Sequence, residues 1–244
     1  MNKINIIISK ELLGYFLTPV AYVFLIIFIA AIGAFTFFLG GFFTRGQADL
    51  QPFFSFHPWL YLFLIPAIGM RLWAEERKSG TIELLMTLPV STMQVVLGKF
   101  FAAWIFTLIS LFFTFPIWIT VNYLGNPDNG VIIASYIGSL LMAGAFISLV
   151  SCISALTKNQ VIAFIISVAI SFIFLMSGVD LVLSLFKSWS PDWVVSVVSS
   201  LSILTNFQQI TKGVIDMREV IFFFSMISFF LFLNIIIVDI KKSE

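Results

Sequence analysis

The fold is decided by the stretch of residues 74–99, AEERKSGTIELLMTLPVSTMQVVLGK, the one long polar-bearing interval in the first two-thirds of an otherwise apolar chain. Four charged side chains follow one another from Glu75 to Lys78, and Gly80 comes directly after them. A helix-forming run from Thr81 to Leu88 follows, and Pro89 ends it because proline cannot continue a helix. The stretch therefore predicts a short polar helix between two apolar ones.

The composition around this stretch is that of a membrane protein. Hydrophobic residues make up 60% of the 244 residues and charged residues only 10%, and the mean hydropathy is +1.10. A water-soluble domain does not have these values. The net charge of +1 and the absence of any block of Lys and Arg exclude a nucleic-acid partner. We expect an all-α, polytopic membrane protein whose surface contacts lipids, folded as a single transmembrane domain over residues 1–244.

Uninterrupted apolar length gives the number of spans, because a bilayer core needs about 20 mostly apolar residues per helix. Six transmembrane helices are predicted, at about residues 19–43, 56–73, 95–123, 131–156, 160–179 and 220–238. Residues 1–17 place apolar side chains at helical spacing with charges between them, which indicates a helix lying in the membrane interface. Before the last span, residues 181–212 contain two apolar runs too short to cross, and we expect two short outer half-helices there. Whether they gate a transport path or only rest on the membrane stays open.

The basic residues set the expected orientation, since cytoplasmic loops retain Lys and Arg. With both termini cytoplasmic, nine of the 13 basic residues lie inside and four outside. Residues 74–99 then face the cytoplasm.

Local signals refine these boundaries. Ser91 followed by Gln94 forms an S-x-x-Q capping box that starts the third span. Pro66 and Pro116 fall inside the second and third spans, where each predicts a kink that serves either as a hinge or only to shape the packing. Gly and Ser recur through the fourth span and predict a close packing surface, toward its own bundle or a second copy.

The search for chemistry is largely negative. No span carries paired ionisable groups at its centre, and no GxxxxGK[ST] phosphate-binding loop occurs. The single histidine, His57, is expected at the outer membrane edge without partners for a metal, and Cys152 as a small packing residue. We therefore predict no catalytic residue, no metal site and no cofactor-binding site.

The motif EERKSGTIELLMTLPVS, followed by Gly98 and Lys99 at the entrance to a span, resembles the short cytoplasmic segment between spans two and three of ABC-2 type transporter permeases. Within that superfamily the chain looks most similar to the bacterial gliding-motility and nitrous-oxide-accessory permeases. The layout of interfacial helix, six spans and paired outer helices covers nearly the whole chain.

The resemblance implies a permease subunit in the bacterial inner membrane that pairs with a second permease, identical or related, and with separate ATP-binding cassette ATPase subunits. ATP is bound and hydrolysed on that partner, so the chain is not itself an enzyme and carries no cofactor. Residues 75–90, here called the coupling segment, would form a cytoplasmic coupling helix that docks in the ATPase. The coupling residues implied are Glu75, Glu76, Arg77, Gly80, Thr81, Glu83, Leu84, Leu85 and Pro89.

Two functions remain open on the sequence. The first is export of a substrate driven by the ATPase. The alternative is a mechanical or scaffolding subunit of an ATPase-driven extracytoplasmic machine, which the small outer loops disfavour. An ordinary interfacial helix held by lipid headgroups is the plain structural explanation of the coupling segment.

Overall fold

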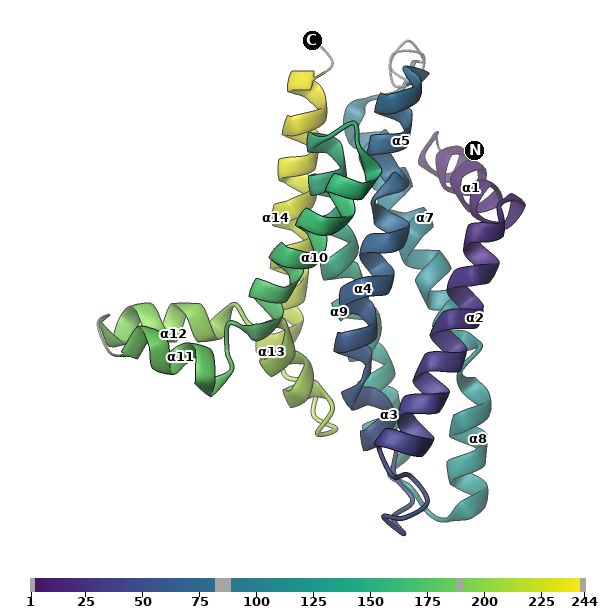
Figure 1. Ribbon diagram of the computed structural model, residues 1–244, viewed down its shortest axis with the longest axis vertical. Helices are drawn as coiled ribbons and strands as arrows, with labels where there is room; N and C mark the ends of the chain where they lie inside the picture. The colour runs from purple at the N-terminus through teal and green to yellow at the C-terminus, as the bar shows by residue number, and fades with distance from the viewer. Residues whose placement is uncertain (1–2, 82–88, 188–190, 242–244) are drawn as a thin grey trace.

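Helices form every regular element in the part of the chain that the computed structural model describes, residues 3–81, 89–187 and 191–241. Figure 1 shows a tall bundle with both ends of the chain at the same end of it. The first half comprises α1 (Lys3–Leu17), α2 (Pro19–Ala34) with its π-helical extension η1 (Phe35–Leu39), α3 (Gln51–Ser55), α4 (His57–Gly69) and α5 (Arg71–Ser79). The second half comprises α7 (Thr92–Phe112), α8 (Phe115–Leu124), α9 (Asn129–Leu156), α10 (Gln160–Met176), α11 (Asp180–Lys187), α12 (Asp192–Ser200), α13 (Ile203–Ile210) and α14 (Met217–Lys241).

Four of the helical stretches within the described ranges are long and apolar enough to cross a membrane. They are Pro19–Leu39, Thr92–Leu124, Asn129–Leu156 and Met217–Lys241, and they lie where the first, third, fourth and sixth spans were predicted. The predicted second span falls on α4 and the start of α5, and the predicted fifth on α10, which is apolar but has only 17 residues. The structure thus bears out an all-helical protein with four candidate spans, and the count of six stays a prediction.

Helix α9 is the centre of the bundle. In its most apolar window 89% of the residues are buried inside the protein. It packs most extensively on α14 and also contacts α4, α5, α7 and α10. Small residues permit this approach: a Cβ atom added at Gly144 would lie 2.9 Å from Ile227 on α14 and 3.1 Å from Trp104 on α7. The small residues of the predicted fourth span therefore pack within their own bundle.

The segment before the last span differs from the prediction of two short helices. Three short helices, α11, α12 and α13, lie between Asp180 and Ile210 in the portion described. Helices α11 and α12 pack against each other and extend sideways from the bundle, across its long axis (Figure 1). Helix α13 instead packs on α9, α10 and α14, and its Ile203, Phe207 and Ile210 are buried. The third helix arises because these apolar residues fall on one face and find a place in the core.

Helix ends follow the predicted local signals. Both halves of the capping box form at the start of α7: the Gln94 N–H donates to Ser91 Oγ at 3.3 Å, and the Ser91 N–H donates to Gln94 Oε1 at 3.1 Å. The third predicted span is interrupted between α7 and α8. Pro116, which has no N–H to donate to the preceding turn, follows directly after this interruption. Pro116 thus stands in the first turn of α8, and the kink predicted there stays a prediction.

Candidate coupling site

Helix α5 contains the charged cluster of residues 75–78. Leu72, Trp73 and Ala74 at its start are buried, whereas Glu75 and Lys78 are exposed. The helix ends at Gly80, whose φ of +72° lies in the left-handed region that glycine adopts without a steric penalty. The first half of α5 is thus anchored in the protein, and its second half forms the start of the coupling segment.

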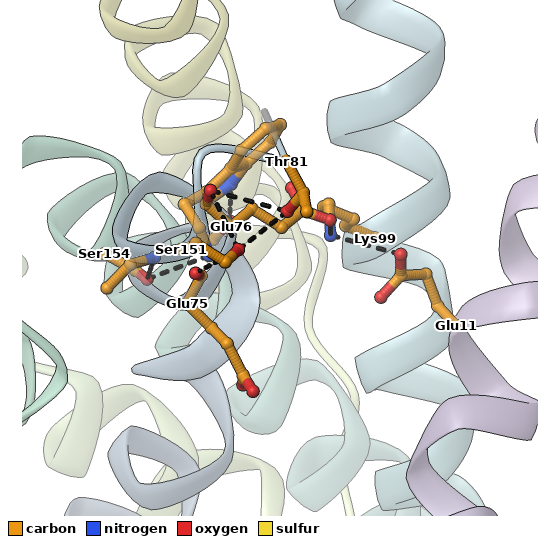
Figure 2. A network of polar contacts seen from close by, with 10 residues as sticks. Glu11, Glu75, Glu76, Thr81, Lys99, Ser151 and Ser154 are labelled. Atoms are coloured by element: carbon orange, nitrogen blue, oxygen red, sulfur yellow. Dashed lines mark hydrogen bonds and ion pairs between the residues drawn. The ribbon is translucent and has the colours of Figure 1, made fainter. Parts of the chain in front are cut away.

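Lys99 on α7 is the charged centre of the site (Figure 2). Its Nζ atom lies 2.7 Å from Oε1 of Glu76 on α5 and 3.1 Å from Oε1 of Glu11 on α1. The lysine side chain is only 2% exposed, and the two carboxylates are 19% and 18% exposed. Three helices that are distant in sequence therefore meet at one ammonium group.

The Lys99 ammonium makes a further favourable contact besides its two ion pairs. Two carboxylates share one cation, and the Lys99 ammonium also lies 5.3 Å from the centre of the Trp73 ring, within reach of a cation–π interaction. The second oxygen of Glu76, Oε2, is buried and has no hydrogen-bond partner among the described residues. Because charges buried in a low-dielectric interior are costly without their partners, losing Lys99 would leave both carboxylates strongly unfavourable.

A second set of contacts joins α5 to α9 through backbone groups. The Ser154 hydroxyl on α9 accepts hydrogen bonds from the N–H groups of Trp73 and Ala74, both at 3.1 Å, and donates to the Met70 carbonyl at 2.8 Å. All four residues belong to the α4–α5 segment or to α9, so the start of α5 is fixed to the central helix.

One turn earlier on α9, Ser151 extends these contacts to α14. Its hydroxyl oxygen accepts from Trp73 Nε1 at 3.1 Å and from Asn234 Nδ2 at 2.6 Å. All three side chains are buried. Helices α5, α9 and α14 therefore share one serine oxygen.

The end of α9 receives two basic side chains. Arg77 on α5 donates to the Ala155 carbonyl at 2.5 Å, and Lys241 on α14 donates to the Leu156 carbonyl at 3.3 Å. The last carbonyls of a helix lack partners within the helix and carry partial negative charge, so cations stabilise them. This is a further link between α5 and the end of α9.

The predicted coupling residues occupy different places. Glu76 and Arg77 make the contacts above, and Glu75 is exposed, with its side chain directed away from Lys99 (Figure 2). The Thr81 hydroxyl lies 2.9 Å from the Ser79 hydroxyl. Pro89 is exposed, and its carbonyl accepts a hydrogen bond from Lys3 on α1.

The remaining three predicted coupling residues, Glu83, Leu84 and Leu85, lie outside the residues that the structure describes. Their part in coupling stays a prediction.

The sequence did not identify the residues that hold α5 in place. Lys99 was expected only as a cytoplasmic charge at the entrance to a span, whereas it is buried between two carboxylates. Its position eight residues into a long apolar helix, after Gly98, was the available signal. Trp73, Ser154 and Asn234 gave no signal, because their partners are far away in the chain.

His57 is buried inside the bundle, where its ring packs against Phe28, Phe53, Phe54 and Tyr61. Its expected place at the outer membrane edge stays a prediction. Its Nδ1 atom lies 3.0 Å from the Phe53 carbonyl. Within residues 3–81, 89–187 and 191–241, no three His, Cys, Asp or Glu side chains gather as a metal site would require.

Long apolar helices around a buried central helix are the architecture of a multi-pass membrane protein. Residues 10–178 match the model of a family described as ABC-2 family transporter protein. The match covers more than half of the chain, which therefore belongs to the ABC-2 transporter family and is a membrane component of a transporter. No curated protein matches the chain.

Proposed function

We propose that the chain is the permease subunit of an ATP-binding cassette exporter, in which ATP hydrolysed on a partner ATPase drives substrate across the bacterial inner membrane. The observation that carries this proposal is that two sets of contacts fix α5 to the bundle, one to α7 and one to α9. Glu76 joins Lys99 on α7, and through it Glu11 on α1, while Trp73, Ala74 and Arg77 bond to α9. A displacement of the coupling segment would reach four helices through these bonds.

The further parts of the proposal concern topology and partners. The chain crosses the membrane six times, with α4–α5 and α10 as the second and fifth spans and both termini in the cytoplasm. It works with a second permease copy, identical or related, in the manner of the gliding-motility and nitrous-oxide-accessory branch. ATP binds only to the partner ATPase, and lipids surround the apolar outer faces. Both termini lying at the end of the bundle where α5 ends supports this topology (Figure 1).

The docking proposal is tested on the coupling segment. Glu83→Arg, or Leu84→Asp together with Leu85→Asp, should abolish stimulation of the ATPase and weaken its co-purification, while membrane insertion stays intact. Lys158→Glu, which reverses an exposed charge in the turn between α9 and α10, is the matched control. Unchanged association of the ATPase with the variants would contradict docking at this segment.

The mechanical alternative has one structural observation in its favour, the sideways projection of α11 and α12. These helices pack on each other and, through α12, on α13, and would offer an arm to an extracytoplasmic machine. Reconstitution separates the two functions. ATP turnover that moves no candidate solute and responds to none would favour the mechanical function.

A further inference from the structure

The helical hydrogen-bonding pattern of the segment that leads to the coupling site is interrupted at one residue, Met70, although the backbone there keeps helical dihedral angles, with φ of −57° and ψ of −26°. Helix α4 ends at Gly69 and α5 begins at Arg71, so Met70 alone separates them. Interruptions of a helix have identifiable causes, of which proline and an inserted side chain are two. Pro66 does not explain this break, because a proline removes its own hydrogen bond to the preceding turn. On the following side the helix is regular: the Met70 N–H donates to the Pro66 carbonyl at 2.9 Å.

The inserted side chain is Ser154. In an uninterrupted α-helix the Ala74 N–H would donate to the Met70 carbonyl, four residues earlier. Here the Ser154 hydroxyl is bonded to both groups, accepting from Ala74 at 3.1 Å and donating to Met70 at 2.8 Å. It also accepts from the Trp73 N–H at 3.1 Å, whose usual acceptor would be the Gly69 carbonyl.

The hydrogen-bonding capacity of this hydroxyl is used completely. A serine hydroxyl has one hydrogen to donate and two lone pairs to accept with. Ser154 uses its hydrogen and both lone pairs in hydrogen bonds to the backbone of the α4–α5 segment, and its side chain is fully buried. Ser148, two turns earlier on the same helix and equally buried, instead donates to the Ala145 carbonyl of α9 itself. The contacts of Ser154 are therefore not the default behaviour of a buried serine on this helix.

Close packing next to the break presses α4 onto α9. A Cβ atom added at Gly69 would lie 2.4 Å from Cγ1 of Val150. The glycine therefore allows the two helices to approach closely enough for the serine, one turn further along α9, to reach the backbone.

We propose that the Ser154 hydroxyl is a positioning group that holds the α4–α5 segment broken at Met70 and thereby fixes the direction in which α5 carries the coupling segment. Without the hydroxyl, the Met70 carbonyl and the Ala74 N–H would pair directly, and the angle between α4 and α5 would change. The direction of α5 is thus set by α9 as well as by the helix that precedes it. The consequence for coupling rests on the proposed function, but the geometry of the break does not.

The test measures the distance between spin labels at Phe63 on α4 and Lys78 on α5, both exposed, in the full chain with Cys152 replaced by alanine and diluted with unlabelled protein. Ser154→Ala should shift this distance distribution. Ser148→Ala removes an oxygen from the same helix without touching α5 and should leave the distribution unchanged. An unshifted distribution in Ser154→Ala would overturn the proposal.

A second pair of variants repeats the test if Ser154→Ala is not recovered. Ser154→Thr keeps the hydroxyl and Ser154→Val replaces it with a methyl group in a side chain of the same shape. The threonine variant should keep the distance of the unsubstituted chain and the valine variant should shift it; equal distances in the two would overturn the proposal.

The complex with the ATPase separates this inference from the proposed function. In that complex Ser154→Ala should lower substrate-coupled ATP hydrolysis several-fold relative to Ser148→Ala. A shifted label distance with unchanged coupling would support the break at Met70 and contradict the proposed coupling function.

Discussion

The Nζ atom of Lys99 lies 2.7 Å from Oε1 of Glu76, although Glu76 lies near the start of the coupling segment and Lys99 follows its end, 23 positions later in the chain. The ion pair joins α5 and α7, the two helices that flank the remainder of that segment. A force on the segment therefore acts on both helices together, since neither can move away without separating buried charges.

Removing the central cation should be strongly destabilising. Lys99→Met leaves the carboxylates of Glu11 and Glu76 largely buried without their partner, and breaking a buried ion pair in this way typically costs between about 3 and 5 kcal/mol. Thermal or denaturant unfolding in detergent measures the loss. Lys78→Met, which removes an exposed lysine from α5, is the control and should change stability little.

The same experiment distinguishes charge from packing. Adding Glu11→Gln and Glu76→Gln to Lys99→Met removes all three charges and should recover much of the lost stability. If the triple variant is as unstable as Lys99→Met alone, the loss comes from the shape of the lysine side chain and not from its charge.

The contact of α1 with α7 depends on Gly98. A Cβ atom at this position would lie 2.6 Å from Cγ2 and 2.8 Å from Cβ of Ile7, and the Cβ atom of Ile7 is fixed by the backbone, so a side-chain rotation cannot relieve the clash. Gly98→Val should displace α1, expose it to protease and cost about 1 to 3 kcal/mol. Gly14→Val is the matched control, because no atom lies within 4 Å of its added Cβ. Equal protease sensitivity of the two variants would contradict this account.

The capping box fixes where α7 begins. Ser91→Ala removes the side-chain acceptor for the Gln94 N–H and should destabilise the first turn of α7 by about 1 kcal/mol. Hydrogen exchange of the amides of that turn checks this prediction. Ser91→Asn, which keeps a capping oxygen, should retain most of the protection; loss of protection in both variants would show that the cap is not what stabilises the turn.

Asn234 should matter less than its burial implies. Its Nδ2 atom donates to Ser151, but its Oδ1 atom is buried without a partner among the residues described. Asn234→Leu loses one interhelical hydrogen bond, worth on the order of 0.6 kcal/mol in membrane proteins, and also removes an unsatisfied acceptor. We expect a change in unfolding free energy below about 1 kcal/mol. A loss several times larger would mean that the amide holds α14 in place.

The long apolar runs sufficed to locate most helices. The spans at Pro19, Thr92, Asn129 and Met217 follow from continuous apolar length, and the start of α7 follows from Ser91 and Gln94, because these signals are local. The break at Met70 is not local. It depends on the Ser154 hydroxyl, 84 positions later in the chain, so no sequence pattern around Met70 predicts it.

The residues of the candidate coupling site also divide into those that a local sequence signal identifies and those that it does not. Glu76 and Arg77 stand in a recognisable motif, and their charges alone draw attention. Lys99 takes its role from Glu11, 88 positions earlier, and a lysine near the end of a span looks the same whether it reaches the membrane surface or a buried carboxylate. Sequence reasoning could therefore identify the segment that carries the motif, but not the residues outside it that hold it to the bundle.

The burial of α9 bears on how the protein is made. A polypeptide is synthesised from its N-terminus, so α9 enters the membrane well before α14, the helix that covers it most extensively. Until Ile227 arrives, the close-packed position at Gly144 lacks its neighbour on α14, and until Asn234 arrives, Ser151 lacks one of its two donors. Biogenesis of the central helix therefore finishes only with the last helix of the chain.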